Sequence, residues 1–99
     1  MILFEKRFKD AILAGTKTRT YRYGKKRWNE GATHQAKTDY SAGSCFALLK
    51  ITSVRKACIY SLRESDAKAD GFSCLSALLS YLDSGYEVWE VKFELARSL

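Results

Sequence analysis

The stretch Gly15-Thr16-Lys17-Thr18-Arg19-Thr20-Tyr21-Arg22 decides how this 99-residue chain is interpreted. Its glycine can end a helix in a left-handed conformation, and the residues after it alternate as in a β-strand. The alternation places Thr20 and Arg22 on one face, and Arg19 and Tyr21 on the other. Burying such polar groups without partners costs roughly 2 kcal/mol or more each. The strand is therefore expected to face solvent or a ligand that is negative or hydrogen-bonding.

The regions on either side of this stretch predict a mixed α+β domain. Upstream, a short apolar edge strand at residues 2–4 precedes an amphipathic helix at 5–14. Downstream, strands are expected at 32–37, 45–54 and 87–95. Helices are expected at about 61–69, opened by a capping box from Ser61 to Glu64, and after Ser73. In the last strand, Trp89, Val91, Phe93 and Leu95 should face the core, and Glu90, Lys92 and Glu94 the solvent.

Length and composition bound the remaining possibilities. Ninety-nine residues, 46% of them hydrophobic, form one domain spanning 1–99 with a curled sheet or small open barrel. No apolar run reaches about 18 residues, so no membrane segment is expected. Three widely spaced cysteines and one histidine predict no metal site, no cofactor and no disulfide framework. These features are typical of a reduced, cytoplasmic protein. We expect it to be a monomer.

The positive charge is concentrated in one part of the chain. The net charge is +6, and between residues 17 and 37 basic side chains far outnumber the single acid, Glu30. Cations interleaved with aromatic rings are typical of a surface that binds single-stranded nucleic acid. The candidates for such a surface are Arg19, Tyr21, Arg22, Lys25, Lys26 and Arg27.

Plainer interpretations of the same residues stay open. The Lys25–Arg27 run is equally well a solubilising loop, and Trp28 is expected to pack in the core. Lys17 and Arg22 could be solvated residues at a strand edge, and Thr20 a residue chosen for its β-propensity. His34, alone among polar residues, is expected to be an exposed strand residue.

The order of several motifs resembles the ASCH family of the PUA-like superfamily. The basic stretch is followed by Trp28-Asn29-Glu30-Gly31, an apolar strand, the run Ala67-Lys68-Ala69-Asp70-Gly71-Phe72, and a terminal strand Val91-Lys92-Phe93-Glu94-Leu95. The resemblance covers nearly the whole chain. It implies a PUA-like mixed β-barrel of five to six strands, with helices at the rim and a cleft on one side.

The resemblance also implies a function and a site. Family members are associated with RNA or nucleoside binding, and some are similar to small bacterial amidohydrolases that remove the acetyl group from acetylated cytidine. In those enzymes a lysine and a threonine of the first motif act with a mid-chain acid. By motif position these fall on Lys17, Thr20 and Asp70, and the motif arginine falls on Arg22.

This sequence departs from the family pattern at several positions, and these departures decide how we rank the possible functions. Asp70 is one methylene shorter than the usual glutamate, Ala32 stands where a second acid is usual, and Lys25–Arg27 is a cationic insertion. These departures favour an RNA- or nucleotide-binding domain. The alternative is a nucleoside amidohydrolase, which requires Lys17 and Thr20 to reach one pocket, either through a bulge in the strand or with Lys17 in the turn before the strand begins. A ribonuclease ranks lower, because the chain has no histidine pair.

Overall fold

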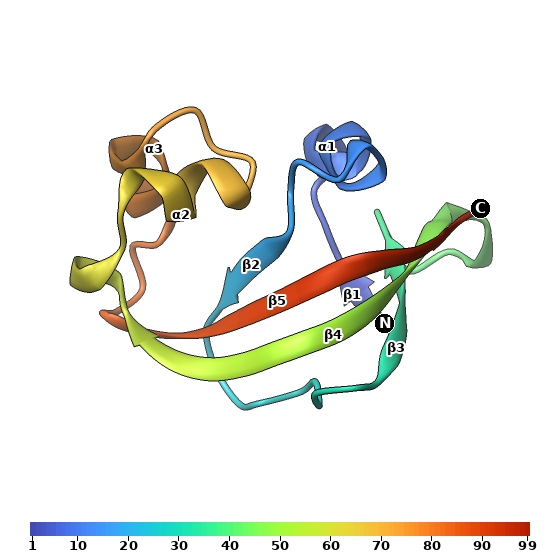
Figure 1. Ribbon diagram of the computed structural model, residues 1–99, viewed down its shortest axis with the longest axis horizontal. Helices are drawn as coiled ribbons and strands as arrows, with labels where there is room; N and C mark the ends of the chain where they lie inside the picture. Colours follow the sequence, from blue (N-terminus) through green and yellow to red (C-terminus); the bar gives the residue numbers. More distant parts are fainter.

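A computed structural model describes all residues, 1–99, as a curled five-stranded sheet carrying short helices (Figure 1). The elements follow in the order β1 (Ile2–Leu3), η1 (Lys6–Phe8), α1 (Lys9–Ala14), β2 (Arg19–Arg22), β3 (Thr33–Lys37), η2 (Ala42–Ser44), β4 (Cys45–Cys58), η3 (Ile59–Ser61), α2 (Glu64–Ala69), α3 (Leu75–Tyr81) and β5 (Glu87–Ser98). The expected α+β class is confirmed, with a five-stranded sheet that curls into a half-barrel and carries helices at its rim.

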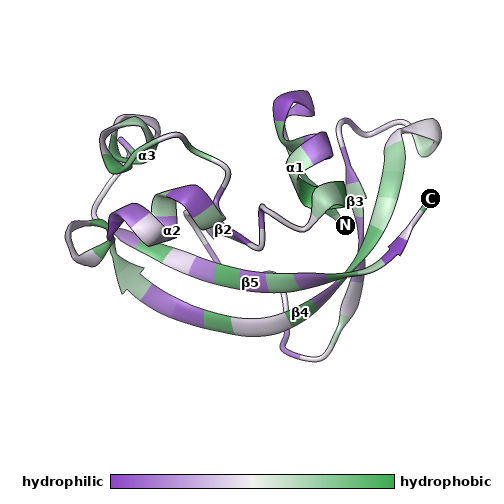
Figure 2. Ribbon diagram, turned by 45° about the horizontal axis from the view of Figure 1, so that its top comes forward, coloured by the Kyte–Doolittle hydropathy of each residue, from purple (hydrophilic) through white to green (hydrophobic).

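The two longest strands form the backbone of the sheet. β4 and β5 pair antiparallel from Ala47 opposite Ser98 to Cys58 opposite Glu87. Their register shifts twice, and such irregularities bend a strand and increase its twist. Figure 2 shows β4 and β5 as curved ribbons banded in hydrophilic and hydrophobic colours. Both strands run further than the sequence predicted, because pairing with each other stabilises polar residues that carry no strand signal of their own.

The half-barrel is left open between β1 and β2. The strand order is β1-β3-β4-β5-β2, so β1 and β2 are the two edges of the sheet and do not pair with each other. β1 is parallel to β3, and β2 is antiparallel to β5, with Thr20 opposite Val91. In Figure 1, α1 lies on one side of β2 while α2 and α3 lie on the other. We call the gap between β1 and β2 the seam.

The concave side of the sheet holds one hydrophobic core of 21 buried residues. Leu49, Ile51 and Val91 from the long strands and Leu78 from α3 are fully buried. Trp28 is 7% exposed and belongs to this core, which confirms the expectation for it. No helix has both the length and the apolar character that a membrane crossing requires.

Two expectations about local structure are wrong at their boundaries. The first helix starts as a 3-10 turn, and its α-helical part begins only at Lys9. Ser61 does not cap α2, because its hydroxyl donates to Cys58 O at 2.7 Å within η3. Instead the Asp66 carboxylate accepts from the Arg63 backbone N–H at 2.8 Å, which satisfies an orphan donor at the start of α2.

The strict alternation expected for the last strand is also wrong at two positions. Val91 and Phe93 are buried as predicted, but Leu95 is 37% exposed where β5 extends beyond the core. Glu90 was expected in solvent and is only 2% exposed. The opposite face of the sheet is therefore partly covered as well, by charged partners described below.

Candidate functional site

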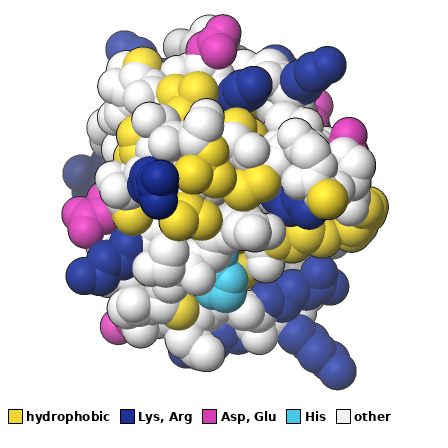
Figure 3. Space-filling model, turned by 90° about the vertical axis from the view of Figure 1, so that its right-hand side faces the viewer, with side chains coloured by type: hydrophobic (Ala, Val, Ile, Leu, Met, Phe, Trp, Pro, Cys, Tyr) yellow, Lys and Arg dark blue, Asp and Glu magenta, His cyan; other side chains and the backbone are white.

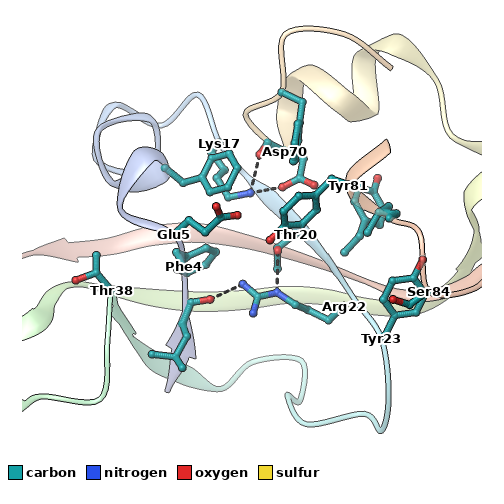
Figure 4. Close-up of a pocket in the computed structure, with 15 residues that line it drawn as sticks. Phe4, Glu5, Lys17, Thr20, Arg22, Tyr23, Thr38, Asp70, Tyr81 and Ser84 are labelled. Atoms are coloured by element: carbon teal, nitrogen blue, oxygen red, sulfur yellow. Dashed lines mark hydrogen bonds and ion pairs between the residues drawn. The ribbon is translucent and has the colours of Figure 1, made fainter. Parts of the chain in front are cut away.

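A cleft of about 510 Å³ lies at the seam. Its walls come from the segment joining β1 to α1, from β2, and from the residues that follow α2 and α3 (Figure 4). Six aromatic residues line it: Phe4, Phe8, Tyr21, Tyr23, Phe72 and Tyr81. Among them stand the side chains of Lys17, Thr20, Arg22 and Asp70. Apolar walls with a few converging polar groups are typical of a small-molecule site.

The end of α1 positions Lys17. Gly15 has φ +79°, a left-handed conformation that glycine adopts without strain. The backbone N–H groups of Thr16 and Lys17 both donate to Ala11 O, at 2.9 and 3.1 Å. β2 begins only at Arg19, so Lys17 lies in the turn before the strand. This position, which strand alternation alone would not give, lets Lys17 and Thr20 border one cleft.

Lys17 and Asp70 form a buried ion pair. Lys17 Nζ donates to Asp70 Oδ1, to Asp70 O at 2.6 Å and to Arg19 O at 3.1 Å. The two residues are 2% and 4% exposed. The ammonium also lies 4.5 Å from the ring centroid of Phe8. An ammonium has three donors, so each of them has an acceptor, and Lys17 is held in one orientation.

Burial brings the pKa values of Lys17 and Asp70 closer together. It raises the pKa of the Asp70 carboxyl to about 6, although the charge and hydrogen bond of Lys17 act against the rise. It lowers the pKa of Lys17 from its ordinary value, although Asp70 acts against the fall. Desolvation disfavours both charged forms, and a carboxyl that titrates near neutral pH can exchange protons with a ligand.

A glycine turn places Asp70 over Lys17. Asp70 ends α2, where its N–H donates to Asp66 O at 3.0 Å, and Phe72 N–H donates back to Ala67 O at 2.9 Å. Between them Gly71 has φ +89°. A Cβ at this position would stand 3.0 Å from Cδ1 of Phe8, so only glycine lets the chain pass here without displacing that ring.

Arg22 spans the seam. Its Nη2 donates to Leu3 O on β1 at 2.6 Å, and its Nε donates to Thr20 Oγ1 at 3.0 Å (Figure 4). The guanidinium lies 5.2 Å from the ring centroid of Phe4 and forms no ion pair with a carboxylate. Lys17 pairs with Asp70, and Glu5, the other carboxylate of the lining, pairs with Arg7 at 3.4 Å, so Arg22 has no carboxylate partner in the cleft.

The other face of β2 carries a separate polar cluster. Arg19 Nη1 lies 2.6 Å from Asp66 Oδ1, so the structure does not bring this guanidinium to the cleft. Tyr21 borders the cleft but is 4% exposed, and its hydroxyl donates to Glu90 Oε2 at 2.9 Å. Arg55 Nε donates to Glu90 Oε1 at 2.9 Å. Burial raises the pKa of Tyr21, which therefore stays a neutral donor.

Sequence reasoning missed Glu90 because its alternation with Trp89 and Val91 indicated a solvent-facing residue. The residues that pair with Glu90 on the neighbouring strands would have indicated its burial. Tyr21 on β2 and Arg55 on β4 are both opposite Glu90 in the register. A carboxylate flanked by a hydroxyl and a guanidinium can be buried because its charge and lone pairs are satisfied.

The cationic loop lies beside the cleft without lining it. Lys25, Lys26 and Arg27 are exposed and take part in no ion pair. Arg27 borders a second hollow of about 430 Å³ together with His34. His34 is half-buried where an exposed residue was expected, and burial lowers its pKa. No three His, Cys, Asp or Glu side chains gather in a way that would hold a metal ion.

No protein-family model and no curated protein matches the sequence. Solved structures do match. An ASCH protein from Zymomonas mobilis gives a TM-score of 0.74 at 15% identity, over 99% of this chain and 70% of that chain. An ASCH domain from Lactobacillus crispatus gives 0.70 at 16%, over 96% of this chain and 76% of that chain. A protein from Enterococcus faecalis gives 0.70 at 16%, over 100% of this chain and 84% of that chain. At these identities the likeness establishes the fold, and the fold of this chain is that of ASCH domains.

Proposed function

We propose that the chain is an RNA- or nucleotide-binding domain whose cleft at the seam receives a nucleobase. One observation carries the proposal: aromatic walls surround a polar floor made by the Thr20 hydroxyl and the Arg22 guanidinium. A nucleobase has two apolar faces and a polar edge, so it matches aromatic walls with its faces and converging donors with its edge. The volume of about 510 Å³ lies within the usual range for small-ligand sites.

The charge of the cleft supports a ligand that carries phosphate. The Lys17–Asp70 pair is internally neutral, which leaves Arg22 and the neighbouring Lys25, Lys26 and Arg27 without carboxylate partners. Unbalanced cations on a half-enclosed surface attract polyanions and concentrate them near the site. Six of the other cationic side chains are paired with carboxylates: Arg7, Lys17, Arg19, Arg55, Lys56 and Lys92.

The first test compares two threonines of the same segment. Thr20→Val removes a hydroxyl that borders the cleft, whereas Thr18→Val changes an exposed threonine outside it. Titration calorimetry with a short single-stranded oligoribonucleotide should show about a tenfold loss of affinity for Thr20→Val, since one hydrogen bond contributes about 1 kcal/mol or more. Thr18→Val should bind as the wild type does. Equal affinities in the wild type and both variants would show that the cleft is not part of the RNA-binding surface.

The second test is the salt dependence of binding. If three phosphates are neutralised, raising the salt concentration about fourfold should lower the affinity for a single strand roughly 20-fold. Replacing the three loop cations by glutamine should flatten this response. The control makes the same charge change at three exposed, unpaired lysines elsewhere: Lys6, Lys50 and Lys68. If the loop variant shows the same salt dependence as the wild type, the three loop cations do not contact the RNA phosphates.

A second candidate function is hydrolysis of an acylated nucleoside. The observation that favours it is the convergence of Lys17, Thr20 and Asp70 on the same cleft, the arrangement that the family resemblance requires. In this reaction water adds to the acyl carbon, the bond from that carbon to nitrogen breaks, and acetate and the free amine leave. Ionised Asp70 would take a proton from the attacking water and pass it to the nitrogen that leaves, the Thr20 hydroxyl would position the water, and Lys17 would hold the carboxylate in place.

Hydrolysis and binding are separated by measuring both on the same variants. Acetate release from an acetylated cytidine should disappear in Lys17→Ala and in Thr20→Val, while Thr18→Val keeps it. The rate should fall as the pH drops through about 6, because a general base must be ionised. A wild type that binds the nucleoside but releases no acetate supports the binding domain alone.

A further inference from the structure

The second hollow adjoins the cleft along the seam. Its volume is about 430 Å³, and it shares Leu3, Arg22 and Tyr23 with the cleft. The hydrogen bond from Arg22 to Leu3 O therefore stands between the two spaces. A ligand longer than one nucleoside, bound in the cleft, would meet this arginine and then enter the second hollow.

Two guanidinium groups face this hollow without a carboxylate. Arg22 donates one N–H to the Thr20 hydroxyl oxygen and one to Leu3 O. A guanidinium has five N–H donors, so Arg22 has further donors available for a ligand. Arg27 is exposed and unpaired. The pKa of Arg22 is lowered, mainly by burial and in smaller part by the charge of Arg27. An anion between two like charges removes their repulsion and accepts from both, and the planar fork of arginine suits a phosphate.

The rest of the lining suits a sugar and a base. Tyr40 is 78% exposed, so its ring is free to stack on a base. Trp28 borders the hollow from the core side. His34 Nε2 is a buried ring nitrogen with no hydrogen-bond partner within the protein. Figure 3, in which the single histidine is cyan, shows part of its side chain at the surface of this face. His34 borders the hollow, and a ligand hydroxyl or base edge there gains a hydrogen bond when the ring turns its unpaired nitrogen toward it.

We propose that this hollow is a second nucleotide subsite. It takes the phosphate joined to the nucleoside in the cleft, on Arg22 and Arg27, and it stacks the neighbouring base on Tyr40. His34 lies beside that nucleotide as a hydrogen-bonding group. The inference rests on the proposed function and deepens it, because the recognised ligand becomes at least a dinucleotide step of a single strand. A site built for a free nucleoside has no use for the two unpaired arginines.

Affinity measurements with ligands of increasing length test the subsite. Each of the four ribonucleosides and the matching homodinucleoside monophosphates are titrated into the wild type. At least one dinucleotide should bind about tenfold or more tightly than its nucleoside, since a charge-assisted contact or a stacked base contributes roughly 1–3 kcal/mol. Equal affinities for nucleoside and dinucleotide would overturn the subsite and leave the proposed function standing. Binding of none of the eight probes would overturn the proposed function and the subsite with it.

Two substitutions with matched controls locate the effect. Tyr40→Ala and Arg27→Gln should each reduce dinucleotide affinity about fivefold to tenfold and leave nucleoside affinity unchanged. Tyr60, 80% exposed, and Arg97, exposed and unpaired, provide the control substitutions Tyr60→Ala and Arg97→Gln, which should change neither affinity. Tyr40→Ala behaving like Tyr60→Ala would contradict the stacking, and Arg27→Gln behaving like Arg97→Gln would contradict the phosphate contact.

His34 supplies an independent reporter because it is the only histidine of the chain. Its ring Cε1–H gives one resolved signal in a proton–carbon NMR spectrum of the wild type. The dinucleotide should move this signal, whereas the nucleoside alone should leave it in place, since His34 does not line the cleft. A dinucleotide that binds tightly without moving the His34 signal passes outside the hollow, and the proposal then fails.

Discussion

Two polar clusters meet on β2, and they differ in what they leave unpaired. On the outer face, Glu90 is surrounded by Arg55, Arg19 and the Tyr21 hydroxyl, and Arg19 and Glu90 line neither the cleft nor the second hollow. On the cleft face, Lys17 and Asp70 satisfy each other, while donors of Arg22 remain free beside an open volume. The comparison teaches that charge within a strand does not by itself mark a site. Unpaired groups that face a cavity do.

The two clusters also differ in their access to water. The side chains of Lys17 and Asp70 are 1% and 6% exposed, whereas the Arg55 side chain beside Glu90 is 66% exposed. A buried charge that loses its partner cannot be rehydrated, but an exposed one can. Substitutions in the two clusters should therefore have unequal costs.

The largest effect is expected from breaking the buried pair. Asp70→Ala leaves the ammonium of Lys17 without its carboxylate, and such a change costs about 3–5 kcal/mol of unfolding free energy. Urea denaturation followed by circular dichroism measures it. The double variant Lys17→Met with Asp70→Leu should recover most of the loss, because a buried ion pair can be replaced by apolar groups at little cost. A loss below about 1 kcal/mol in Asp70→Ala would show that this pair is not held away from water.

The next effect should come from the turn that places Asp70. Gly71→Ala forces a left-handed backbone on alanine and sets its Cβ 3.0 Å from Phe8, so we expect a loss of about 2–3 kcal/mol. Gly31→Ala is the matched control, since Gly31 has φ +85° but open space around its Cβ position. It should cost about 1 kcal/mol. Equal losses of unfolding free energy in the two variants would mean that the Phe8 ring moves aside for the new Cβ at no measurable cost.

A smaller effect is expected on the outer face. Glu90→Gln removes the charge that holds Arg19 and Arg55, but Arg55 can return to water and Arg19 keeps Asp66, so the cost should be about 1–2 kcal/mol. Ligand affinity should not change, because Glu90 does not line the cleft. A loss of RNA or nucleoside binding in a folded Glu90→Gln protein would contradict the division of β2 into a structural and a functional face.

The same division explains what the sequence could predict. Gly15 after an apolar helical pattern and the alternation that follows it were enough to place a helix end and a polar strand. Local chemistry determines both, since a glycine tolerates positive φ and a strand has a period of two. The resemblance to the ASCH family added Asp70, which no local rule connects to Lys17, 53 positions away.

The arrangement around the seam could not be predicted from the sequence. Whether Arg22 meets solvent or Leu3 depends on β1 and β2 ending at opposite edges of a sheet that curls back on itself. That curvature comes from register shifts in β4 and β5, which carry no simple sequence signal. Glu90 was misplaced for a related reason: alternation assigns a residue to a face but does not say what covers that face.

The smallest predicted effect concerns the pH dependence of stability. The pKa of Asp70 rises from 3.8 to about 6 on folding, so between about pH 4 and pH 6 the folded state binds more protons than the unfolded state. The contribution of this carboxyl to stability is therefore present at low pH and is lost as the pH rises through about 6. Asp39 has the opposite sign, because hydrogen bonds from Ser41 lower its pKa, and its contribution is lost as the pH falls.

Two variants separate these opposite contributions. Relative to the wild type, Asp70→Asn should become more stable with rising pH by up to about 1 kcal/mol per pH unit between about pH 4 and pH 6. Asp39→Asn should shift in the other direction, but only below about pH 4, because the pKa of Asp39 is lowered from 3.8. Urea unfolding at several pH values measures both slopes. Parallel curves for the wild type and Asp70→Asn would mean that Lys17 stabilises the carboxylate enough to cancel the desolvation. The cleft would then hold an ion pair that stays charged throughout this pH range, and the hydrolase function would have no base that titrates near pH 6. The proposed binding function would be unaffected, because it depends on Thr20 and Arg22.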